Sequence, residues 1–155
     1  MPGRFRGTRR IRRGLLAICL PVAAVVAAGL VLTGCGQSTP ATIDRVIEDI
    51  ETQAAFEMIQ REANNPNFTL LDLRTPEEIA DGYIQGADNI DFYDEDFREQ
   101  LDELDKGRKY VIYCRSGGRS GKTREMMREL GFTEVYNTLG GINEWRAVGL
   151  PVVVP

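Results

Sequence analysis

Histidine is absent from the 155-residue sequence, and cysteine occurs only three times, as Cys19, Cys35 and Cys114. Without an imidazole, no thiol of this chain can lose its proton to a histidine acting as a general base. The sequence also has no low-complexity tract and no internal repeat, and its length suits one domain with a single buried core. We expect neither a metal ion nor a cofactor.

Acidic residues outnumber basic ones in most of the chain. Residues 1–34 carry six arginines and no acid, whereas residues 35–155 carry 13 basic and 23 acidic side chains. The longer segment therefore has a formal net charge of −10. Such a surface repels polyanions, so we expect no nucleic acid among the partners of this protein.

The first 35 residues have the pattern of an export signal: a basic head, the apolar run "GLLAICLPVAAVVAAGLVL" and then small residues. An uncleaved transmembrane anchor is the alternative, because a run of about 19 apolar residues can span a bilayer. The sequence "LTGC", from Leu32 to Cys35, resembles a bacterial lipobox, which implies cleavage after Gly34 and a lipid on the thiol of Cys35. We expect a lipoprotein-type signal peptide over residues 1–34, a lipidated N-terminus and tether over 35–42, and a domain over 43–155.

Cys114 is left as the single free thiol by this interpretation. Cys19 leaves with the signal peptide and Cys35 becomes a thioether, so no internal disulfide can form. A lone thiol in an exported protein indicates either a partner chain or chemistry. Both interpretations of the N-terminus place the domain on a membrane, and we expect a lipid anchor on the extracytoplasmic side of the cell membrane.

Short apolar runs alternate with amphipathic stretches over residues 43–155. The runs "FTLLDL" and "KYVIYC" are typical of buried strands, and "TPEEIADG" predicts a short helix with Thr75 as its N-cap. The other expected strands are residues 45–50, 86–90 and 133–138, and the other expected helices are 52–65 (capped by Thr52), 94–104, 119–132 and 140–149. This alternation predicts an α/β domain, a three-layer sandwich with a central mostly parallel sheet flanked by helices.

Cys114 ends one of these strands, and the loop Arg115, Ser116, Gly117, Gly118, Arg119 follows it. The two glycines let the backbone curl so that successive N–H groups converge on one centre. Such donors, together with the arginines, favour a thiolate without any histidine. The alternative is a structural cysteine followed by an ordinary turn. The compact Cys-Arg-Ser-Gly-Gly-Arg-Ser run favours the reactive thiol.

Residues next to the loop have expected roles of their own. Asp72 and Arg74 end the preceding strand; we expect Asp72 to bond to the loop N–H groups or to Arg119, and the alternative for both is a surface ion pair. Ser120 is expected to cap the following helix. Gly140 and Gly141 are expected to allow a close approach of loops. Trp145 is expected to lie in the core.

Several motifs together resemble the rhodanese-like domains, which are sulfurtransferases that carry sulfur as a cysteine persulfide. The motifs stand in the family's order: "LLDLRTPEE", "DGYIQGADNI", "YCRSGGRS", "ELGF", "VYNTLGGINEW" and "GLPV". The phosphatase relatives of this fold have one more residue between cysteine and arginine, and that longer loop fits phosphate. The spacing from Cys114 to Arg119 therefore resembles the sulfurtransferase branch. Tyr83 stands where the family commonly has histidine, which leaves the local hydrogen bonding open.

The resemblance implies a membrane-anchored sulfurtransferase that takes sulfur from a donor such as thiosulfate or a persulfide and passes it to a thiol or cyanide. Cys114 is the implied nucleophile, the N–H groups of residues 115–119 stabilise the sulfur anion, and Arg115 holds the anionic end of the donor. Arg119 either does the same or braces the loop. The alternatives are a rhodanese module that docks on or delivers persulfide to one protein acceptor, and a thiol redox sensor.

Overall fold

The computed structural model describes residues 44–155, so the expected signal peptide, the lipidation site Cys35 and the tether lie outside the described residues. Strands and helices alternate in the described part. Their order is β1 (Val46–Ile50), α1 (Thr52–Glu62), β2 (Phe68–Asp72), α2 (Pro76–Ala80), β3 (Ala87–Asn89), α3 (Phe97–Asp102), β4 (Lys109–Tyr113), α4 (Gly118–Leu130), β5 (Glu134–Thr138) and α5 (Gly141–Ala147). No helix of residues 44–155 combines the length and the apolar character that a membrane span requires.

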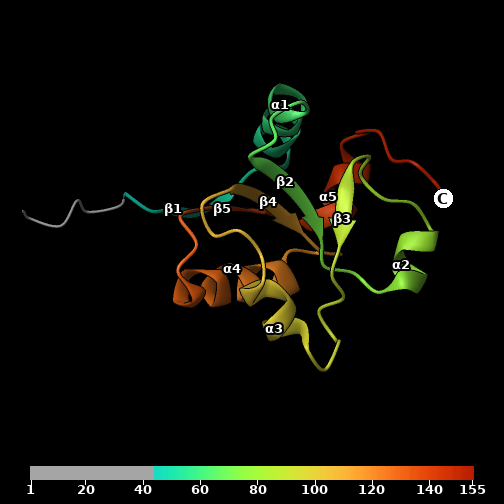
Figure 1. The fold of residues 1–155 in the computed structure, drawn as a ribbon. Helices are drawn as coiled ribbons and strands as arrows, with labels where there is room; N and C mark the ends of the chain where they lie inside the picture. The colour runs from blue at the N-terminus through green and yellow to red at the C-terminus, as the bar shows by residue number, and fades with distance from the viewer. Residues whose placement is uncertain (1–43) are drawn as a thin grey trace, which may run out of the picture. The chain divides into compact units, whose positions relative to one another are not determined.

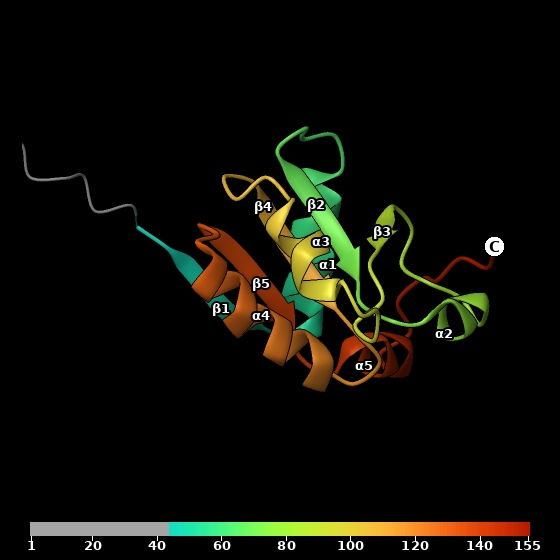
Figure 2. The same cartoon turned by 60° about the horizontal axis from the view of Figure 1, so that its bottom comes forward.

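The strands form one sheet in the order β1-β5-β4-β2-β3, and every pair of neighbouring strands is parallel (Figure 2). Helices α1 and α5 contact each other on one face, and α3 and α4 contact each other on the opposite face (Figure 1). The predicted three-layer α/β sandwich is therefore confirmed, and the sheet is wholly parallel rather than mostly so. The one antiparallel bridge outside the named strands joins Tyr83 to Val153 within residues 44–155.

Each face of the sheet has its own apolar core. One core lies against α3 and α4 and includes Leu71, Ile112, Met127 and Phe132; Cys114 belongs to it. The other lies against α1 and α5, and its members include Ala55, Val111, Tyr113, Ile142 and Trp145. Trp145 is 1% exposed, which confirms its expected place in the core. Strands β2 and β4 face both cores, which explains why their sequences are apolar without alternation.

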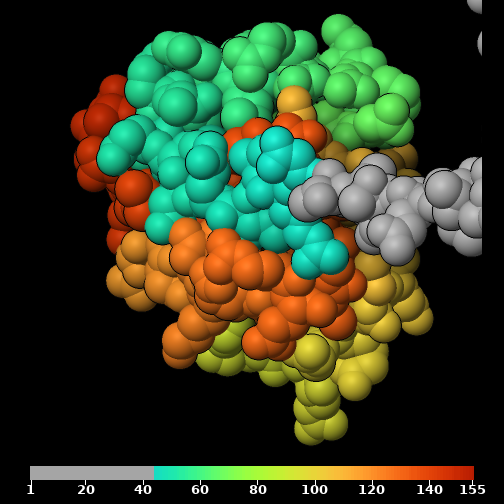
Figure 3. All heavy atoms as spheres, turned by 90° about the vertical axis from the view of Figure 1, so that its left-hand side faces the viewer, coloured from blue at the N-terminus to red at the C-terminus, as the bar shows by residue number. Residues whose placement is uncertain are grey.

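The carboxyl ends of β2 and β4 lie side by side, since Asp72 is paired with Tyr113 in the register of these two strands. Cys114 follows Tyr113 directly, so the thiol stands at the carboxyl edge of the sheet. In open parallel sheets this edge is where ligands bind, because the loops that lead into the helices meet there. The two edge strands of the sheet are β1 and β3, and β1 lies between α1 and α4 in Figure 3.

Of the two threonines predicted as helix N-caps, Thr75 is one in the structure and Thr52 is not. Thr75 caps α2 as expected: its side chain accepts from the Glu78 N–H, and the Glu78 carboxylate accepts from the Thr75 N–H, a complete capping box. Thr52 as a cap is wrong. Glu51 occupies the N-cap position of α1, and the Thr52 hydroxyl donates to the Leu139 carbonyl 3.0 Å away. The tertiary contact with the loop after β5 decides the role of this hydroxyl.

Candidate active site

The loop from Cys114 to Arg119 leads from β4 directly into α4. Gly117 is the N-cap of α4 and has φ +91°, a left-handed conformation that a glycine adopts without strain. A Cβ at this position would also lie 3.3 Å from the Gly140 nitrogen. Both the backbone angle and the neighbouring loop therefore require glycine here, so that the chain can turn sharply around the sulfur.

The first turn of α5 fixes which way the loop carbonyls point. The N–H of Ile142 donates to the Cys114 carbonyl at 2.9 Å, and the N–H of Asn143 donates to the Arg115 carbonyl at 3.1 Å. A Cβ on Gly141 would lie 2.3 Å from the Cys114 carbonyl oxygen, which confirms that this glycine allows the close approach. Because the carbonyls face α5, the N–H groups further along the loop are free to face the sulfur.

Cys114 is 1% exposed, and its sulfur accepts two hydrogen bonds. The Gly117 N–H donates to Sγ at 3.2 Å, and the Ser120 hydroxyl donates to Sγ at 3.4 Å. Burial by itself raises the pKa of the Cys114 thiol. The Ser120 hydroxyl, followed by the nearby N–H groups of Ser120, Ser116 and Gly117, favours the thiolate and outweighs burial, so the pKa of Cys114 is lowered from its ordinary value. The loop thus favours a thiolate without any imidazole.

Ser120 is not a helix cap, and the prediction that it caps α4 is wrong. It lies inside the first turn of α4, is fully buried, and has Gly117 rather than a hydroxyl residue as the N-cap before it. Its oxygen lies 3.4 Å from Cys114 Sγ and 3.3 Å from the Gly117 carbonyl. A hydroxyl carries one proton and can donate to only one of them at a time. Ionisation of the sulfur favours the bond to Sγ, because a charged acceptor makes the stronger hydrogen bond.

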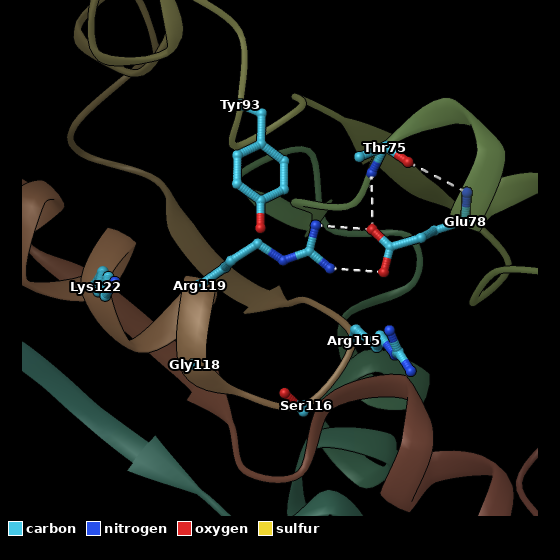
Figure 4. A pocket seen from close by; sticks show the side chains of 8 residues that line it. All are labelled: Thr75, Glu78, Tyr93, Arg115, Ser116, Gly118, Arg119 and Lys122. Carbon is cyan, nitrogen blue, oxygen red and sulfur yellow. Dashed lines mark hydrogen bonds and ion pairs between the residues drawn. The ribbon is translucent and has the colours of Figure 1, made fainter.

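Arg119 is held by a partner on α2. Its Nη1 and Nη2 donate to the two carboxylate oxygens of Glu78, each at 2.7 Å, and Figure 4 shows the two groups facing each other. The ring of Tyr93 lies over the guanidinium, 5.4 Å from its central carbon to the ring centroid. Of the two roles expected for Arg119, the geometry favours bracing the loop, since Glu78 neutralises its charge.

A cavity of about 570 Å³ lies over the loop. We call it the Lys122 cavity. Its lining residues come from α2, α4, the loop and the segment before α3, and they are Thr75, Glu78, Tyr93, Arg115, Ser116, Gly118, Arg119 and Lys122 (Figure 4). Because the sulfur is nearly inaccessible, only a small reactant, or the reactive tip of a larger one, can reach it from this side.

A second cavity, of about 380 Å³, lies beside the first. We call it the Arg146 cavity; its lining includes Arg74, Glu78, Asp81, Arg115, Asn143 and Arg146. The two cavities share Glu78 and Arg115. Arg115 is exposed, and Figure 4 shows its side chain pointing away from Lys122. This side chain makes no hydrogen bond or ion pair with any residue of 44–155, so the arginine next to Cys114 is free to bind an anion.

Asp72 does not reach the loop, and its expected bond to the loop N–H groups or to Arg119 is wrong. Its carboxylate accepts from Arg74 Nε at 2.9 Å and from Arg74 Nη2 at 2.6 Å, and both side chains are 2% exposed. The alternative of a surface ion pair fails as well. Arg74 also donates to the carbonyls of Glu78 and Gly82, so the buried pair holds α2 and the residues after it against the end of β2.

Tyr113 connects this buried pair to β4, the strand that leads to Cys114. Its hydroxyl donates to Asp72 Oδ2 at 2.6 Å and accepts from the Ile84 N–H at 3.2 Å. Burial, with Asp72 next in effect, raises the pKa of Tyr113, so the phenol stays protonated and donates. Tyr83 is half-buried and lines a separate small cavity with Asp72 and Pro155. Its backbone pairs with Val153, and its side chain is not among those around the sulfur.

Three residues of the site were missed by sequence reasoning: Glu78, Tyr93 and Lys122. Glu78 carried a signal, because the capping box fixes its carboxylate at the start of α2. Tyr93 carried a weaker signal, because it is an aromatic residue in an acidic segment of the sequence. In the structure it is 68% exposed. Lys122 had none. Within residues 44–155, no cluster of three or more histidine, cysteine, aspartate or glutamate side chains could hold a metal ion.

The fold and the site together define a parallel α/β domain with one activated cysteine in a strand-to-helix loop. The family model of the rhodanese-like domain matches residues 55–148, and the chain belongs to this family. A sulfurtransferase from Allochromatium vinosum is 36% identical over 110 residues, 71% of this chain and 98% of that protein. The thiosulfate sulfurtransferase PspE of Escherichia coli is 34% identical over 74 residues, 48% of this chain and 70% of PspE.

Solved structures agree with the family assignment. The crystal structure of a rhodanese-related protein from Thermoplasma volcanium superposes with a TM-score of 0.59 at 31% identity, over 70% of this chain and 99% of that one. The expected rhodanese-like fold is therefore confirmed, and the protein belongs to a family with sulfurtransferase members that act on sulfur donors and acceptors.

Proposed function

We propose that this protein is a membrane-anchored sulfurtransferase that carries sulfane sulfur as a persulfide on Cys114. The observation that carries the proposal is the setting of Cys114 Sγ, which accepts from the Gly117 N–H and the Ser120 hydroxyl inside a loop that lowers its pKa. The spacing from Cys114 to Arg119 and the sulfurtransferase relatives support sulfur rather than phosphate as the group transferred.

The reaction proceeds in two displacements at sulfur. The Cys114 thiolate attacks the outer sulfur of thiosulfate, a new S–S bond forms, and sulfite leaves with the electron pair of the broken S–S bond. An acceptor thiolate or cyanide then attacks the outer sulfur of the persulfide, and Cys114 leaves as the thiolate. The products are an acceptor persulfide or thiocyanate. No external oxidant or reductant is consumed, since each displacement forms one bond to the transferred sulfur and breaks one bond to it.

The loop stabilises a negative sulfur in both states. Its N–H groups and the Ser120 hydroxyl are already oriented in the folded protein, so little reorganisation accompanies the change from thiolate to persulfide anion. Two cationic side chains of the Lys122 cavity, Arg115 and Lys122, are not paired with Glu78, and they attract an anionic donor such as thiosulfate. Arg119 keeps the loop in place through Glu78.

We further propose that the domain is held on the extracytoplasmic side of the cell membrane by a lipid on Cys35. The support is the sequence pattern alone: six arginines, an uncharged apolar run and then "LTGC". A cysteine that bears several acyl chains exceeds the threshold of about two membrane signals that stable anchoring needs. Cys35→Ser protein, expressed in a bacterial host and extracted from its membranes, is expected to lack lipid. A lipid-bearing Cys35→Ser protein would contradict the lipobox.

Mass spectrometry of the purified full chain after incubation with thiosulfate tests the transfer. We expect Cys114 to gain the mass of one sulfur atom while an equal amount of sulfite appears, and Cys114→Ser protein to do neither. Cys35→Ser protein is the matched control and is expected to transfer sulfur normally. If neither thiosulfate nor an organic persulfide loads Cys114, the enzyme proposal fails and a protein-docking or redox-sensing module remains.

A further inference from the structure

The Arg146 cavity has no role in the reaction as described so far, although it borders the reacting loop. Its wall at Asn143 belongs to the turn of α5 whose N–H groups bond to the loop carbonyls, with Asn143 donating to Arg115 at 3.1 Å. A volume of about 380 Å³ falls within the range of small-molecule sites, about 300–1,000 Å³. A molecule in this cavity therefore lies next to the residue that follows the nucleophile.

The cavity presents two arginine side chains that have donors to spare. Arg146 uses only Nη2 within residues 44–155, to donate to the carbonyls of Asp81 at 2.6 Å and Gly82 at 3.3 Å. Its Nε and Nη1, and the whole guanidinium of Arg115, make no hydrogen bond in the described part of the chain. Arg74 is neutralised by Asp72, and Glu78 by Arg119. Asp81 is the remaining acid, and it stands against the two arginines Arg115 and Arg146. The cavity therefore keeps a net positive charge and is suited to a carboxylate.

The buried sulfur restricts what a larger substrate can place at the reaction centre. Cys114 is 1% exposed, so only the terminal sulfur of an organic thiol or persulfide can approach it. The rest of such a molecule has to lie outside the loop. Cyanide has no such remainder, and the remainder of thiosulfate is a single sulfonate group that Arg115 and Lys122 can hold in the Lys122 cavity without the Arg146 cavity.

We propose that the Arg146 cavity binds the carboxylate of a small organic thiol, or of its persulfide, through Arg115 and Arg146 while the sulfur reacts at Cys114. The proposal rests on the proposed function and deepens it, because it assigns an organic, carboxylate-bearing substrate to one of the two displacements. In the acceptor step the thiolate R–S⁻ takes the outer sulfur and leaves as R–S–S⁻. In the donor step the persulfide loses its outer sulfur to Cys114 and leaves as R–S⁻.

Binding without reaction tests the site separately from sulfur transfer. S-methylglutathione carries the carboxylates of glutathione but has no free thiol, and its affinity for the full chain is measured by titration calorimetry. We expect Arg146→Gln to weaken this affinity about tenfold, the loss of one hydrogen bond to a charged group. Arg146→Lys is expected to keep most of the affinity, and Asp81→Asn to increase it because a repelling charge is removed. No binding to the wild-type protein at millimolar concentration would overturn the inference and leave the proposed function untouched.

Kinetics then show which step uses the cavity. With thiosulfate as donor and glutathione as acceptor, Arg146→Gln is expected to raise the KM for glutathione about tenfold with kcat unchanged, and to leave cyanide and 2-mercaptoethanol unaffected. Glutathione persulfide with cyanide tests the donor step in the same way. Arg98→Gln is the matched control, because this exposed arginine lines neither cavity; a glutathione KM in Arg146→Gln protein equal to that in Arg98→Gln protein would overturn the inference.

Discussion

The ends of β2 and β4 are neighbours in the sheet and both are polar, yet they are built in opposite ways. After β2, the Asp72 carboxylate and the Arg74 guanidinium are 2% exposed and satisfy each other with two short hydrogen bonds. After β4, the loop directs hydrogen-bond donors at one sulfur that brings no opposite charge of its own. In the first arrangement, which we call the closed end, the two charges neutralise each other. The second, which we call the open end, can stabilise an additional negative charge on the sulfur.

The two strand ends at this sheet edge are therefore suited to different roles, the end of β2 to holding the fold and the end of β4 to chemistry at the sulfur. A closed buried pair cannot change its charge without a large cost, so it is suited to fixing α2 and Tyr113 in place. A set of neutral donors around a thiol can stabilise a negative charge on the sulfur without a counter-ion. Glu78 joins the two ends, because its carbonyl accepts from Arg74 and its carboxylate from Arg119.

The largest expected effect follows from breaking the closed end. Asp72→Ala leaves the Arg74 guanidinium buried without its carboxylate and removes the acceptor of the Tyr113 hydroxyl. We expect the free energy of unfolding to fall by about 3–5 kcal/mol. Urea denaturation followed by circular dichroism measures the loss.

The control for this change is an exposed ion pair of the same protein. Glu129→Gln removes the partner of Arg98, where the two side chains are 51% and 68% exposed, and is expected to cost less than about 1 kcal/mol. If Asp72→Ala costs no more than Glu129→Gln, the buried pair at the end of β2 does not stabilise the fold.

A smaller effect is expected at the open end. Ser120→Ala removes the hydroxyl that donates to Cys114 Sγ at 3.4 Å. Since donation to the charged form lowers a thiol pKa, its removal is expected to raise the pKa of Cys114. The rate of alkylation by iodoacetamide rises with pH as the thiolate forms, so its midpoint moves to higher pH.

Thr123→Val provides the matched control, because Thr123 is a fully buried hydroxyl of the same helix that donates to the Arg119 carbonyl and not to the sulfur. Its alkylation midpoint is expected to match that of the wild-type protein. Equal midpoints for Ser120→Ala and the wild-type protein would show that the backbone N–H groups alone hold the thiolate.

The sequence predicts the sheet better than the side-chain partners, and Ser120 and Asp72 show why. Runs such as "FTLLDL" and "KYVIYC" are set by burial on both faces of a parallel sheet, which composition alone reveals. The local pattern at Ser120 also fits a helix cap, and only the three-dimensional turn at Gly117 places its hydroxyl against the sulfur. Asp72 and Arg74 are two residues apart, but the Asp72 carboxylate also accepts from Tyr113, which is distant in sequence.

The smallest effect concerns the contact that joins the two ends. Arg119, by hydrogen bonding, lowers the pKa of Glu78 from its ordinary value of 4.5. A carboxylate with a lowered folded-state pKa stabilises the fold above about pH 4.5, and this contribution is lost as the pH falls through its folded pKa. Glu78→Gln is expected to cost about 1 kcal/mol at neutral pH and to flatten the decline of stability below pH 4.5, measured by urea denaturation at several pH values.

In an Arg119→Gln background the same change is expected to have almost no effect on this pH dependence, because the partner that lowers the pKa is gone. An undiminished effect in that background would mean that the capping box at Thr75, and not Arg119, accounts for the role of Glu78.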